Sequence, residues 1–283
     1  MILAGITLFN PEIGRLEENI SSIYNQVDAI VCIDNHSDNI DEIENLLKNH
    51  WPDVKLLKND KNEGIAKALN QLFDFSKKNG HDYVLTLDQD SVCPNNMIEE
   101  YMKYINYERL GSICPQCVDR NFEHYEISEE IREVDKCITS ASLVPVKVWE
   151  DVGGFYEELF IDFVDHDFCA KLKEKNYKIL QIGTVKLLHE LGNGKRYNIF
   201  GIQFTALNHS SIRKYYMVRN WLFYMYIHES VIDIKAEKKS YHLFFLKTFL
   251  FENNKIDKMK QMLRGRKDGL NMIKEKKWKR NIS

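Results

Sequence analysis

The chain of 283 residues is long enough for one large domain or two modest ones, and 44% hydrophobic residues support a sizeable core. Its 29 Phe and Tyr residues and only 5 prolines exclude wholesale disorder. The formal net charge is −3, but residues 235–283 hold 15 Lys/Arg against 5 Asp/Glu, so this stretch is basic and the remainder acidic. A basic segment on an acidic body predicts an anionic partner, such as a membrane surface, a nucleic acid or a lipid diphosphate.

The N-terminus and the cysteines predict a cytoplasmic protein. Residues 1–6 run directly into an apolar strand pattern, so we expect no signal peptide. No apolar run approaches the length that spans a bilayer. The 6 cysteines are expected to be reduced thiols. Cys114 and Cys117 form a lone CxxC without a second ligand pair, which argues against a zinc site.

Short apolar runs alternate with amphipathic segments along the first part of the chain. This β-α-β alternation predicts a Rossmann-like α/β fold with a mixed, mainly parallel sheet, right-handed crossovers and flanking helices. No GxGxxG or Walker-type loop is present, which argues against dinucleotide cofactors and P-loop chemistry. The predicted strands cover residues 2–9, 29–33, 54–57, 83–87, 111–118 and 180–188, and the predicted helices cover 15–24, 40–49, 62–78, 97–107, 170–175 and 209–220. Residues 121–136 are predicted to be a surface excursion.

Polar residues follow three of the predicted parallel strands, at Asn10, Asp34 and Asp88. The carboxyl ends of parallel strands share one edge of the sheet, and ligands of open α/β sheets bind there. Asp88 and Asp90, spaced i, i+2, offer the oxygen ligands that Mg²⁺ or Mn²⁺ prefers together with a diphosphate. The ordinary alternative is a turn, because Asp and Ser often follow a strand.

A second acidic cluster precedes the helix predicted near residue 170. Asp162, Asp165 and Asp167 lie among aromatic and aliphatic residues, and one of them could act as a general base in a partly desolvated cleft. The alternative is a set of helix-capping residues. The small residues 139–142, which include Ser142, either let a ligand approach the backbone or simply pack tightly.

Two later features suit anion or metal binding. His189 follows a predicted strand and is a candidate metal or phosphate ligand, although a lone His is more often an ordinary polar residue. On the helix predicted over 209–220, Arg213, Tyr216 and Asn220 share a face, and Arg219 lies four residues after Tyr215. Arg and Tyr suit a diphosphate, whereas the alternative is a solvated helix with packed tyrosines.

With these residues in order, the chain resembles inverting glycosyltransferases of family 2, which have the GT-A fold, over roughly residues 1–230. Within the family it is most similar to bacterial rhamnosyltransferases of surface polysaccharide synthesis. The Asp88-Gln89-Asp90 segment resembles the family's DxD, with Asp88 and Asp90 as implied metal ligands and His189 as a further one. The resemblance implies these nucleotide-binding residues: Thr7, Asn10, Pro11, Asp34 (against the pyrimidine), Asn35, Ser37, Asn62, Gly64, Lys67, Asp88, Gln89, Arg213, Tyr216 and Arg219.

The resemblance also implies a catalytic base. Residues 164–167 stand at the family's ED-x-D, so Asp165 is the implied base. Val164 replaces the common Glu, and Asp162 is the alternative base. Asp162, Asp167 and Ser142 are the implied contacts to the acceptor or the sugar. A cation, Mg²⁺ or Mn²⁺, would bridge the diphosphate while the base deprotonates an acceptor hydroxyl, and one displacement inverts the anomeric carbon.

The implied reaction moves L-rhamnose from dTDP-rhamnose to a glycan or to a polyprenyl-diphosphate-linked acceptor. Other sugar nucleotides such as UDP-galactose are the alternative within the class. A nucleotidyltransferase lacks support because the first loop has no Gly-rich, basic segment. A non-catalytic protein that binds nucleotides or nucleic acid through the tail is the alternative from another class, and we expect no nucleic-acid partner.

The segment after the resemblance has its own character. We expect a catalytic domain over residues 1–230 and a basic amphipathic helical extension over 231–283. Aromatic, leucine-like and Lys residues interleave there, which favours a peripheral contact with the inner face of the cell membrane. The alternative is a helical pair that packs on the catalytic domain or on a second subunit, as in a homodimer.

Overall fold

The computed structural model describes residues 1–119, 130–189, 195–199, 202–206 and 208–280. The chain divides into two compact units. Unit 1 comprises residues 1–160 and 168–190, and unit 2 comprises residues 161–167 and 191–283. The predicted domains, 1–230 and 231–283, divide the chain at a different residue and stay a prediction.

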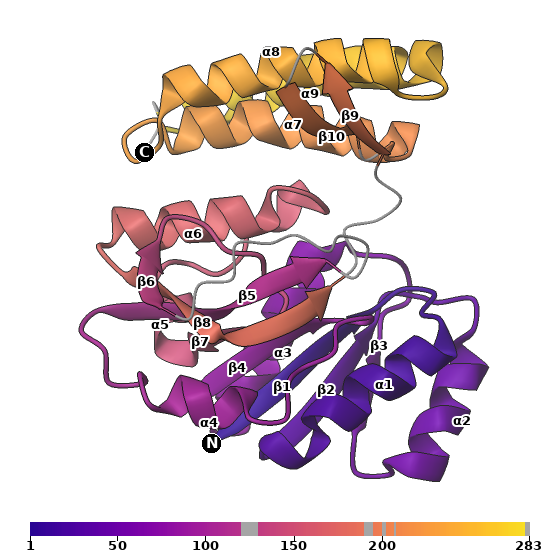
Figure 1. Cartoon of the computed structure of the whole chain (residues 1–283), viewed down its shortest axis with the longest axis vertical. Coiled ribbons are helices and arrows are strands. Elements are labelled where there is room, and N and C mark those ends of the chain that lie inside the picture. Colours follow the sequence, from indigo (N-terminus) through magenta and orange to yellow (C-terminus); the bar gives the residue numbers. More distant parts are fainter. Residues whose placement is uncertain (120–129, 190–194, 200–201, 207, 281–283) are drawn as a thin grey trace. The chain divides into compact units, whose positions relative to one another are not determined.

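The described part of unit 1 is built on one mixed sheet with the strand order β3-β2-β1-β4-β7-β5-β8-β6 (Figure 1). β1 pairs in parallel with β2 and β4, and β2 pairs in parallel with β3, so these four strands end at one edge. β7 is antiparallel to β4 and β5, and β5 is parallel to β8. This confirms the predicted mixed, mainly parallel sheet. The strands are β1 (Ile2–Leu8), β2 (Ala29–Asp34), β3 (Lys55–Lys58), β4 (Tyr83–Asp88), β5 (Leu110–Asp119), β6 (Ile131–Val134), β7 (Ser142–Pro145) and β8 (Lys178–His189).

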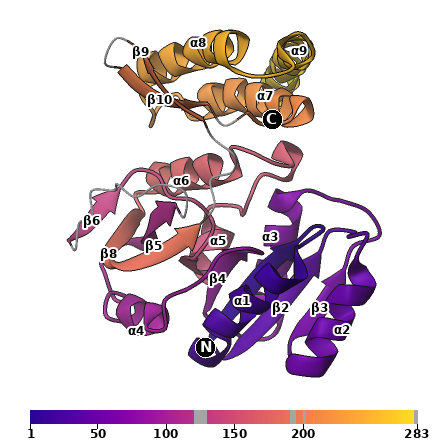
Figure 2. The same ribbon diagram turned by 45° about the vertical axis from the view of Figure 1, so that its right-hand side comes forward.

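Helices cover both faces of this sheet (Figures 1 and 2). Alternate residues of β1, such as Ile6 and Leu8, are buried in a cluster with Leu16 and Ile20 of α1. On the other face, a Cβ atom on Gly5 would lie 2.6 Å from Leu72 of α3, so this helix packs directly on the strand. The helices are α1 (Ile13–Ile23), η1 (Tyr24–Gln26), α2 (Ile40–His50), α3 (Ile65–Lys78), α4 (Met97–Met102), α5 (Val146–Asp151), η2 (Glu157–Leu159) and α6 (Val164–Glu174).

Two predictions for the middle of the chain were wrong in part. The helix predicted over 97–107 ends at Met102, because Tyr104 and Tyr107 make tighter i to i−3 turns. Part of the excursion predicted over 121–136 is strand β6, which is antiparallel to β8. As an edge strand β6 exposes most of its side chains, so its sequence is as polar as that of a loop. Residues 120–129 lie outside the described part.

Unit 2 contains the hairpin β9 (Lys195–Ile199) and β10 (Ile202–Ala206) and the helices α7 (Ser211–Ile227), α8 (Ile234–Phe251) and α9 (Lys255–Arg280). A Cβ atom on Gly265 of α9 would lie 2.3 Å from the carbonyl oxygen of Tyr215, and one on Gly269 would lie 2.7 Å from that of Arg219. Two glycines four residues apart therefore let the backbones of α7 and α9 approach closely. In the described residues, no helix is both long and apolar enough to cross a membrane. The predicted C-terminal helical extension is thus confirmed, and the β9–β10 hairpin was not predicted.

Candidate active site

The loops after β1, β2 and β4 are joined by hydrogen bonds at the carboxyl edge of the sheet. The backbone N–H of Phe9 donates to Gln89 Oε1 at 2.9 Å, and Gln89 Nε2 donates to the carbonyl of Phe9 at 3.3 Å. The N–H of Asn10 donates to Ser37 Oγ at 2.8 Å. Asn10 Oδ1 accepts from the N–H of Asp38 at 2.7 Å. The edge thus brings together Asn10, Ser37 and Gln89, three of the predicted nucleotide-binding residues.

Asp34 is the last residue of β2, and the described residues hydrogen-bond to only one of its two carboxylate oxygens. The residue is 2% exposed, and its Oδ2 accepts from the N–H groups of His36 and Ser37 at 3.0 and 3.1 Å. Its Oδ1 is buried and accepts no hydrogen bond from the described residues. A buried carboxylate oxygen normally has a donor, so this oxygen is suited to an N–H group of a ligand.

The segment before α3 is held beside the β2 loop. Asn35 Nδ2 donates to the carbonyl of Gly64 at 3.2 Å, and Asn62 Oδ1 accepts from the N–H of Gly64 at 2.9 Å. Gly64 has φ +85°, and a Cβ atom there would lie 2.7 Å from the carbonyl oxygen of Phe160. Only glycine fits this backbone. Lys67, on the first turn of α3, pairs with Glu63 at 3.2 Å.

A buried side chain of α1 holds the Asp88–Asp90 loop through two hydrogen bonds. Asn19 Nδ2 donates to the carbonyls of Asp88 and Ser91 at 2.9 and 2.6 Å. Ser140 Oγ accepts from the N–H of Asp88 at 3.1 Å. Neither Asn19 nor Ser140 was predicted to hold this loop, because their sequence positions are remote from it, although Ser140 belongs to the small residues 139–142 that were considered for ligand approach.

The carboxylates of this loop fit a hard divalent cation. Asp88 and Asp90 are half-buried. The Asp90 carboxylate has no hydrogen-bond or ion-pair partner among the described residues, so its oxygens are open to a ligand. The described residues contain no cluster of three or more His, Cys, Asp or Glu side chains arranged for a metal. A cation at Asp88 and Asp90 would therefore take its other ligands from water or from phosphate oxygens, as Mg²⁺ commonly does.

Three further predicted residues lie at the same sheet edge. Thr7 is 7% exposed and pairs with Asp88 in the β1–β4 register. Pro11 is buried, and its carbonyl accepts from Asn39 Nδ2 at 2.8 Å. His189 is the last residue of β8, and its side chain lies outside the described part. The preceding Leu188 forms an isolated bridge with Val92, two residues after Asp90, so the end of β8 lies beside the Asp88–Asp90 loop.

The small residues at 139–142 are packed tightly. Ser140 and Ser142 are 0% and 3% exposed. Ser142 Oγ donates to the carbonyl of Ile138 at 2.7 Å, and Ser140 Oγ lies 2.7 Å from Ser91 Oγ. Contact between Ser142 and an acceptor sugar would therefore require a buried hydrogen bond to open.

The second acidic cluster belongs to unit 2 and is held by α7. Arg213 donates to Asp162 from Nε and Nη2, each at 3.1 Å. The side chain of Asp162 is 10% exposed. Burial raises the pKa of Asp162, while the Arg213 guanidinium opposes this rise and the nearby Asp165 adds to it.

The backbone that precedes α6 is strained and is supported by Asn220. Asp162 and Phe163 have φ of +63° and +65°, which non-glycine residues rarely adopt. Asn220, 0% exposed, donates from Nδ2 to the carbonyls of Ile161 and Asp162 at 2.8 and 2.9 Å. The sequence predicted that Asn220 shares a helix face with Arg213. It did not predict that Asn220 supports residues 161 and 162, because these residues are far from it in the sequence.

The three aspartates of this cluster have different surroundings. Asp167 is 1% exposed, and its Oδ1 lies 2.9 Å from Nε2 of the buried His228. Asp162 is bound by Arg213. Asp165 is half-buried on the first turn of α6, and Oδ1 accepts from the N–H of His166 at 2.8 Å. Among the described residues Asp165 forms no ion pair, so its carboxylate is the one that can accept a proton without breaking such a pair.

The other predicted residues of α7 pack against one another. The Arg219 guanidinium lies 4.8 Å from the ring centroid of Tyr216 and 5.7 Å from that of Tyr215. Arg219 Nε donates to Asn220 Oδ1 at 2.8 Å. Arg219 therefore orients the amide whose nitrogen supports residues 161 and 162.

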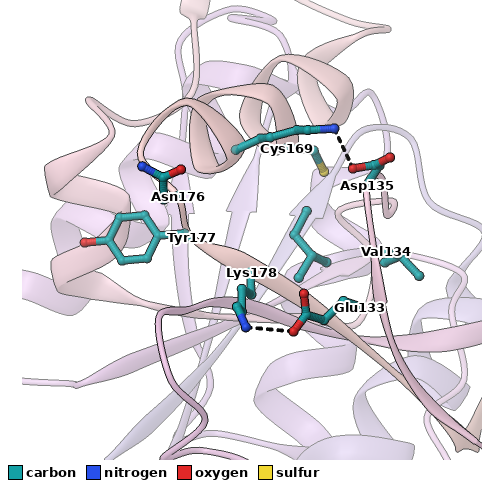
Figure 3. A pocket seen from close by; sticks show the side chains of 9 residues that line it. Glu133, Val134, Asp135, Cys169, Asn176, Tyr177 and Lys178 are labelled. Atoms are coloured by element: carbon teal, nitrogen blue, oxygen red, sulfur yellow. Dashed lines mark hydrogen bonds and ion pairs between the residues drawn. The ribbon is translucent and has the colours of Figure 1, made fainter. Parts of the chain in front are cut away.

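A cavity of about 420 Å³ lies in unit 1 where β6, the end of α6 and the start of β8 meet (Figure 3). Lys173 pairs with Asp135 at 2.7 Å and Lys178 pairs with Glu133 at 2.8 Å. The lining of the cavity includes Cys169 and Tyr177 but none of the predicted site residues. We therefore assign this cavity no part in the reaction.

The predicted site residues fall into two groups. Unit 1 carries the strand-edge residues, from Thr7 to Gln89 and Asp90, together with Ser142 and the end of β8 at His189. Unit 2 carries the three aspartates and the predicted residues of α7. Within each unit the residues support one another through the contacts given above.

Comparisons with solved structures identify this fold. A structure of Staphylococcus aureus TarS residues 1–349 in complex with UDP-GlcNAc matches with a TM-score of 0.63 and 15% identity, over 96% of this chain and 81% of that one. GalNAc-T7 with UDP, GalNAc and Mn²⁺ matches with a TM-score of 0.58 and 15% identity, over 86% of this chain and 54% of that one. These likenesses show that the chain has the GT-A fold of glycosyltransferases.

Sequence comparisons identify the family. Residues 5–173 match the model of glycosyl transferase family 2. The dTDP-rhamnosyl transferase RfbF of Shigella flexneri is 30% identical over an alignment of 299 positions that covers 96% of each chain. The chain belongs to glycosyltransferase family 2, as the order of its motifs predicted, and is a glycosyltransferase.

Proposed function

We propose that this glycosyltransferase moves L-rhamnose from dTDP-rhamnose to a glycan or polyprenyl-diphosphate-linked acceptor, with inversion at the anomeric carbon, during synthesis of a surface polysaccharide. The observation that carries the donor is the 30% identity to a dTDP-rhamnosyl transferase over nearly the whole of both chains. The family match ends at residue 173, whereas the similarity to the rhamnosyl transferase covers nearly the whole chain. It therefore includes α7, which supports the second acidic cluster.

The nucleotide would bind at the strand edge of unit 1. The buried Oδ1 of Asp34, which has no donor among the described residues, would accept the imide N3–H of thymine or uracil. Cytosine has an acceptor at this position and would be rejected. Asn10, Asn35, Ser37 and the Asn62–Gly64 segment form the surrounding polar wall, and Arg213, Tyr216 and Arg219 stay proposed diphosphate contacts.

The diphosphate would bind with Mg²⁺ or Mn²⁺ at Asp88 and Asp90, with His189 as a further proposed ligand. The open carboxylate of Asp90 and the hard oxygen donors support this choice, and GalNAc-T7, a structural neighbour, contains Mn²⁺ together with UDP. When bound, the cation would neutralise the negative charge that develops on the leaving diphosphate.

Asp165 would be the general base. It would take the proton of the acceptor hydroxyl as the oxygen attacks the anomeric carbon and the bond to the diphosphate breaks. Asp162, bound by Arg213, would orient the acceptor and the backbone that leads into α6. The buried Asp167 would hold α6 in place through His228. No covalent enzyme intermediate is needed, because a single displacement inverts the centre.

The protein is proposed to act in the cytoplasm at the inner face of the cell membrane, where a lipid-linked acceptor would be available. The basic C-terminal region would make a peripheral membrane contact, and a homodimer is a further proposal. The charge of residues 235–283 supports an anionic partner.

The test is a titration of the full chain with dTDP, UDP, GDP and CDP, each with and without Mn²⁺, followed by thermal unfolding. Ligands that bind the folded state raise the unfolding temperature. We expect the largest Mn²⁺-dependent rise with dTDP, and rhamnose transfer from dTDP-rhamnose in a product assay. A preference for UDP would replace dTDP-rhamnose by a UDP-linked donor such as UDP-galactose. A lack of any nucleotide response would refute the enzymatic proposal.

A further inference from the structure

Helix α8 of unit 2 has a solvent-exposed face of unusual composition. Its large exposed apolar residues are Leu243, Leu246, Phe249 and Leu250, with exposed fractions of 40%, 52%, 55% and 47%. Spacings of three and four residues place them on one side of the helix. Large apolar side chains exposed together on one element mark an interaction site rather than ordinary surface scatter.

The same face is basic in its first two turns. Lys235, Lys238 and Lys239 are exposed there. At about 100° per residue, Lys239 points in nearly the same direction as Leu243, and Lys235 in nearly the same direction as Leu246. The face therefore changes from cationic to apolar along the length of the helix.

Two acidic residues lie close to these lysines in the chain, and both are engaged by other groups. Asp233, the residue before α8, is exposed and caps the helix by accepting from the N–H groups of Lys235 and Ala236 at 3.0 Å each. Glu237 is the acidic residue of α8, and it is half-buried because it accepts from Trp221 Nε1 at 2.7 Å. The aromatic residues of the opposite face pack inward, where the rings of Tyr241 and Phe244 lie 5.7 and 5.8 Å from that of Trp221. The outward face is thus not needed to hold the helix in unit 2.

A further exposed apolar residue follows the end of α8. Ile256, at the start of α9, is 76% exposed, and the adjacent Lys255 is exposed as well. The start of α9 therefore carries an exposed apolar side chain between the exposed Lys255 and the exposed Asp257.

We propose that this face, which we define as Lys235, Lys238, Lys239, Leu243, Leu246, Phe249, Leu250 and Ile256, binds the surface of an anionic lipid bilayer. Leucine and phenylalanine side chains enter the boundary between headgroups and acyl chains, and the lysines contact lipid phosphates. The proposal deepens the peripheral membrane contact of the proposed function, because it names the helix face and the lipid chemistry.

A second copy of the chain fits this face less well. In a symmetric antiparallel pair of α8 helices, the lysines of one copy would face the apolar half of the other copy, which has no carboxylate to pair with them. In the described part of unit 1 the large exposed apolar residues are scattered over separate elements, for example Phe9 after β1, Met102 on α4 and Ile131 on β6. Single exposed apolar residues on separate elements are ordinary surface scatter. Charge and composition together favour a lipid surface.

The experiment measures co-sedimentation of the full chain with vesicles. One set contains phosphatidylcholine alone, and the other contains equal amounts of phosphatidylglycerol and phosphatidylcholine. We expect binding to the anionic vesicles only. Lys238→Gln/Lys239→Gln and Leu246→Ser/Phe249→Ser should each weaken that binding about tenfold or more, since each pair removes one of the two contributions.

Matched controls are Lys48→Gln on α2 and Ile131→Ser on β6, both at exposed positions of unit 1. These should bind the vesicles like the unchanged protein, and all variants should unfold at similar temperatures. Binding that only the lysine substitutions weaken would overturn insertion of the apolar residues. Absence of vesicle binding, or a dimer that Leu246→Ser/Phe249→Ser dissociates in sedimentation velocity, would overturn the proposal. Nucleotide binding and sugar transfer to a soluble acceptor are separate readouts, so they test the enzymatic proposal independently.

Discussion

Arg213 of α7 donates from Nε and Nη2 to the carboxylate of Asp162, at 3.1 Å for each bond to Oδ1. The two residues are 51 positions apart in the chain, yet the ion pair lies within unit 2 and joins α7 to the backbone that leads into α6. The pair occupies the carboxylate that competes with Asp165 for the role of base. It therefore makes the choice between the two aspartates testable.

Asp165→Asn should lower kcat by about 10²- to 10⁴-fold, the usual contribution of a general base. Binding of the nucleotide, measured by calorimetry, should stay unchanged because Asp165 is not among the residues of the strand edge. Asp162→Asn serves as the comparison and should reduce kcat less. The reverse ranking of the two variants would assign the base to Asp162.

Asn220→Asp should lower kcat and destabilise unit 2. Aspartate keeps the size of asparagine and the acceptor for Arg219, but it cannot donate to the carbonyls of Ile161 and Asp162. Leaving buried carbonyls unpaired costs about 1–3 kcal/mol, and the strained turn before Asp165 loses its support. Kinetics and chemical denaturation measure both effects.

Asn271→Asp, at an exposed position of α9, is the control and should behave like the unchanged protein. The dissociation constant for the nucleotide should be equal in all three proteins. If Asn220→Asp loses stability but keeps the full kcat, Asn220 has a purely structural role.

Asp34→Asn should change the preference for the base. The buried Oδ1 suits the N3–H of thymine and uracil, whereas the amide NH₂ of asparagine can donate to the N3 atom of cytosine. We expect the affinity for dTDP and UDP to fall about tenfold or more, equivalent to about 1.4 kcal/mol, with a smaller loss or a gain for CDP. Asp38→Asn, exposed on the same loop, is the control. Equal losses for all pyrimidine nucleotides would show that Asp34 only stabilises its loop.

Glu252→Gln should strongly lower the free energy of unfolding of the C-terminal helices. Glu252 is 5% exposed and accepts from Lys214 at 2.5 Å and from Lys258 at 2.9 Å, and both lysines are buried. Burial lowers the pKa of Lys214, while the pair with Glu252 opposes that fall. Removing the only carboxylate of this described ion-pair network leaves two buried cations, and such losses cost about 3–5 kcal/mol.

Chemical denaturation of the full chain measures this loss. Glu275→Gln, exposed on α9, is the matched control and should change the free energy of unfolding by less than about 0.5 kcal/mol. A comparably small effect at Glu252 would mean that water reaches the network and solvates the two lysines.

His209 should make unit 2 sensitive to acid. Burial, together with the nearby Arg213 and Lys214, lowers its pKa to about 4. In the unfolded chain the pKa of a histidine is about 6.5. Between these values the unfolded state binds a proton that the folded state does not, so stability is present above the unfolded pKa and is lost as the pH falls.

His209→Gln should reduce the loss of stability between about pH 7 and about pH 5. The measurement is the unfolding temperature at both pH values, with His50→Gln, exposed on α2, as the control. An unchanged difference between the two pH values in His209→Gln would show that other groups cause the acid sensitivity.

Local sequence patterns determined the sheet, its parallel strands and the edge where polar loops meet. Alternating burial in β1 and apolar spacing in α1 and α3 arise from neighbours in the chain, so they can be predicted from the sequence. The strands that end at Asp34 and Asp88 were found for the same reason. The edge strand β6 was missed, because its exposed side chains carry no apolar signal.

The supports of the candidate site could not be found in this way. Asn19 beneath the Asp88–Asp90 loop, Asn220 beneath residues 161 and 162, and the closely packed Gly265 act across long sequence separations. Their hydrogen bonds and close contacts form only when distant segments pack, and no local spacing encodes them. The sequence by itself determined the chemistry of the carboxylates. The tertiary structure decided which carboxylate is bound by Arg213, which is buried against His228 and which forms no ion pair with the described residues.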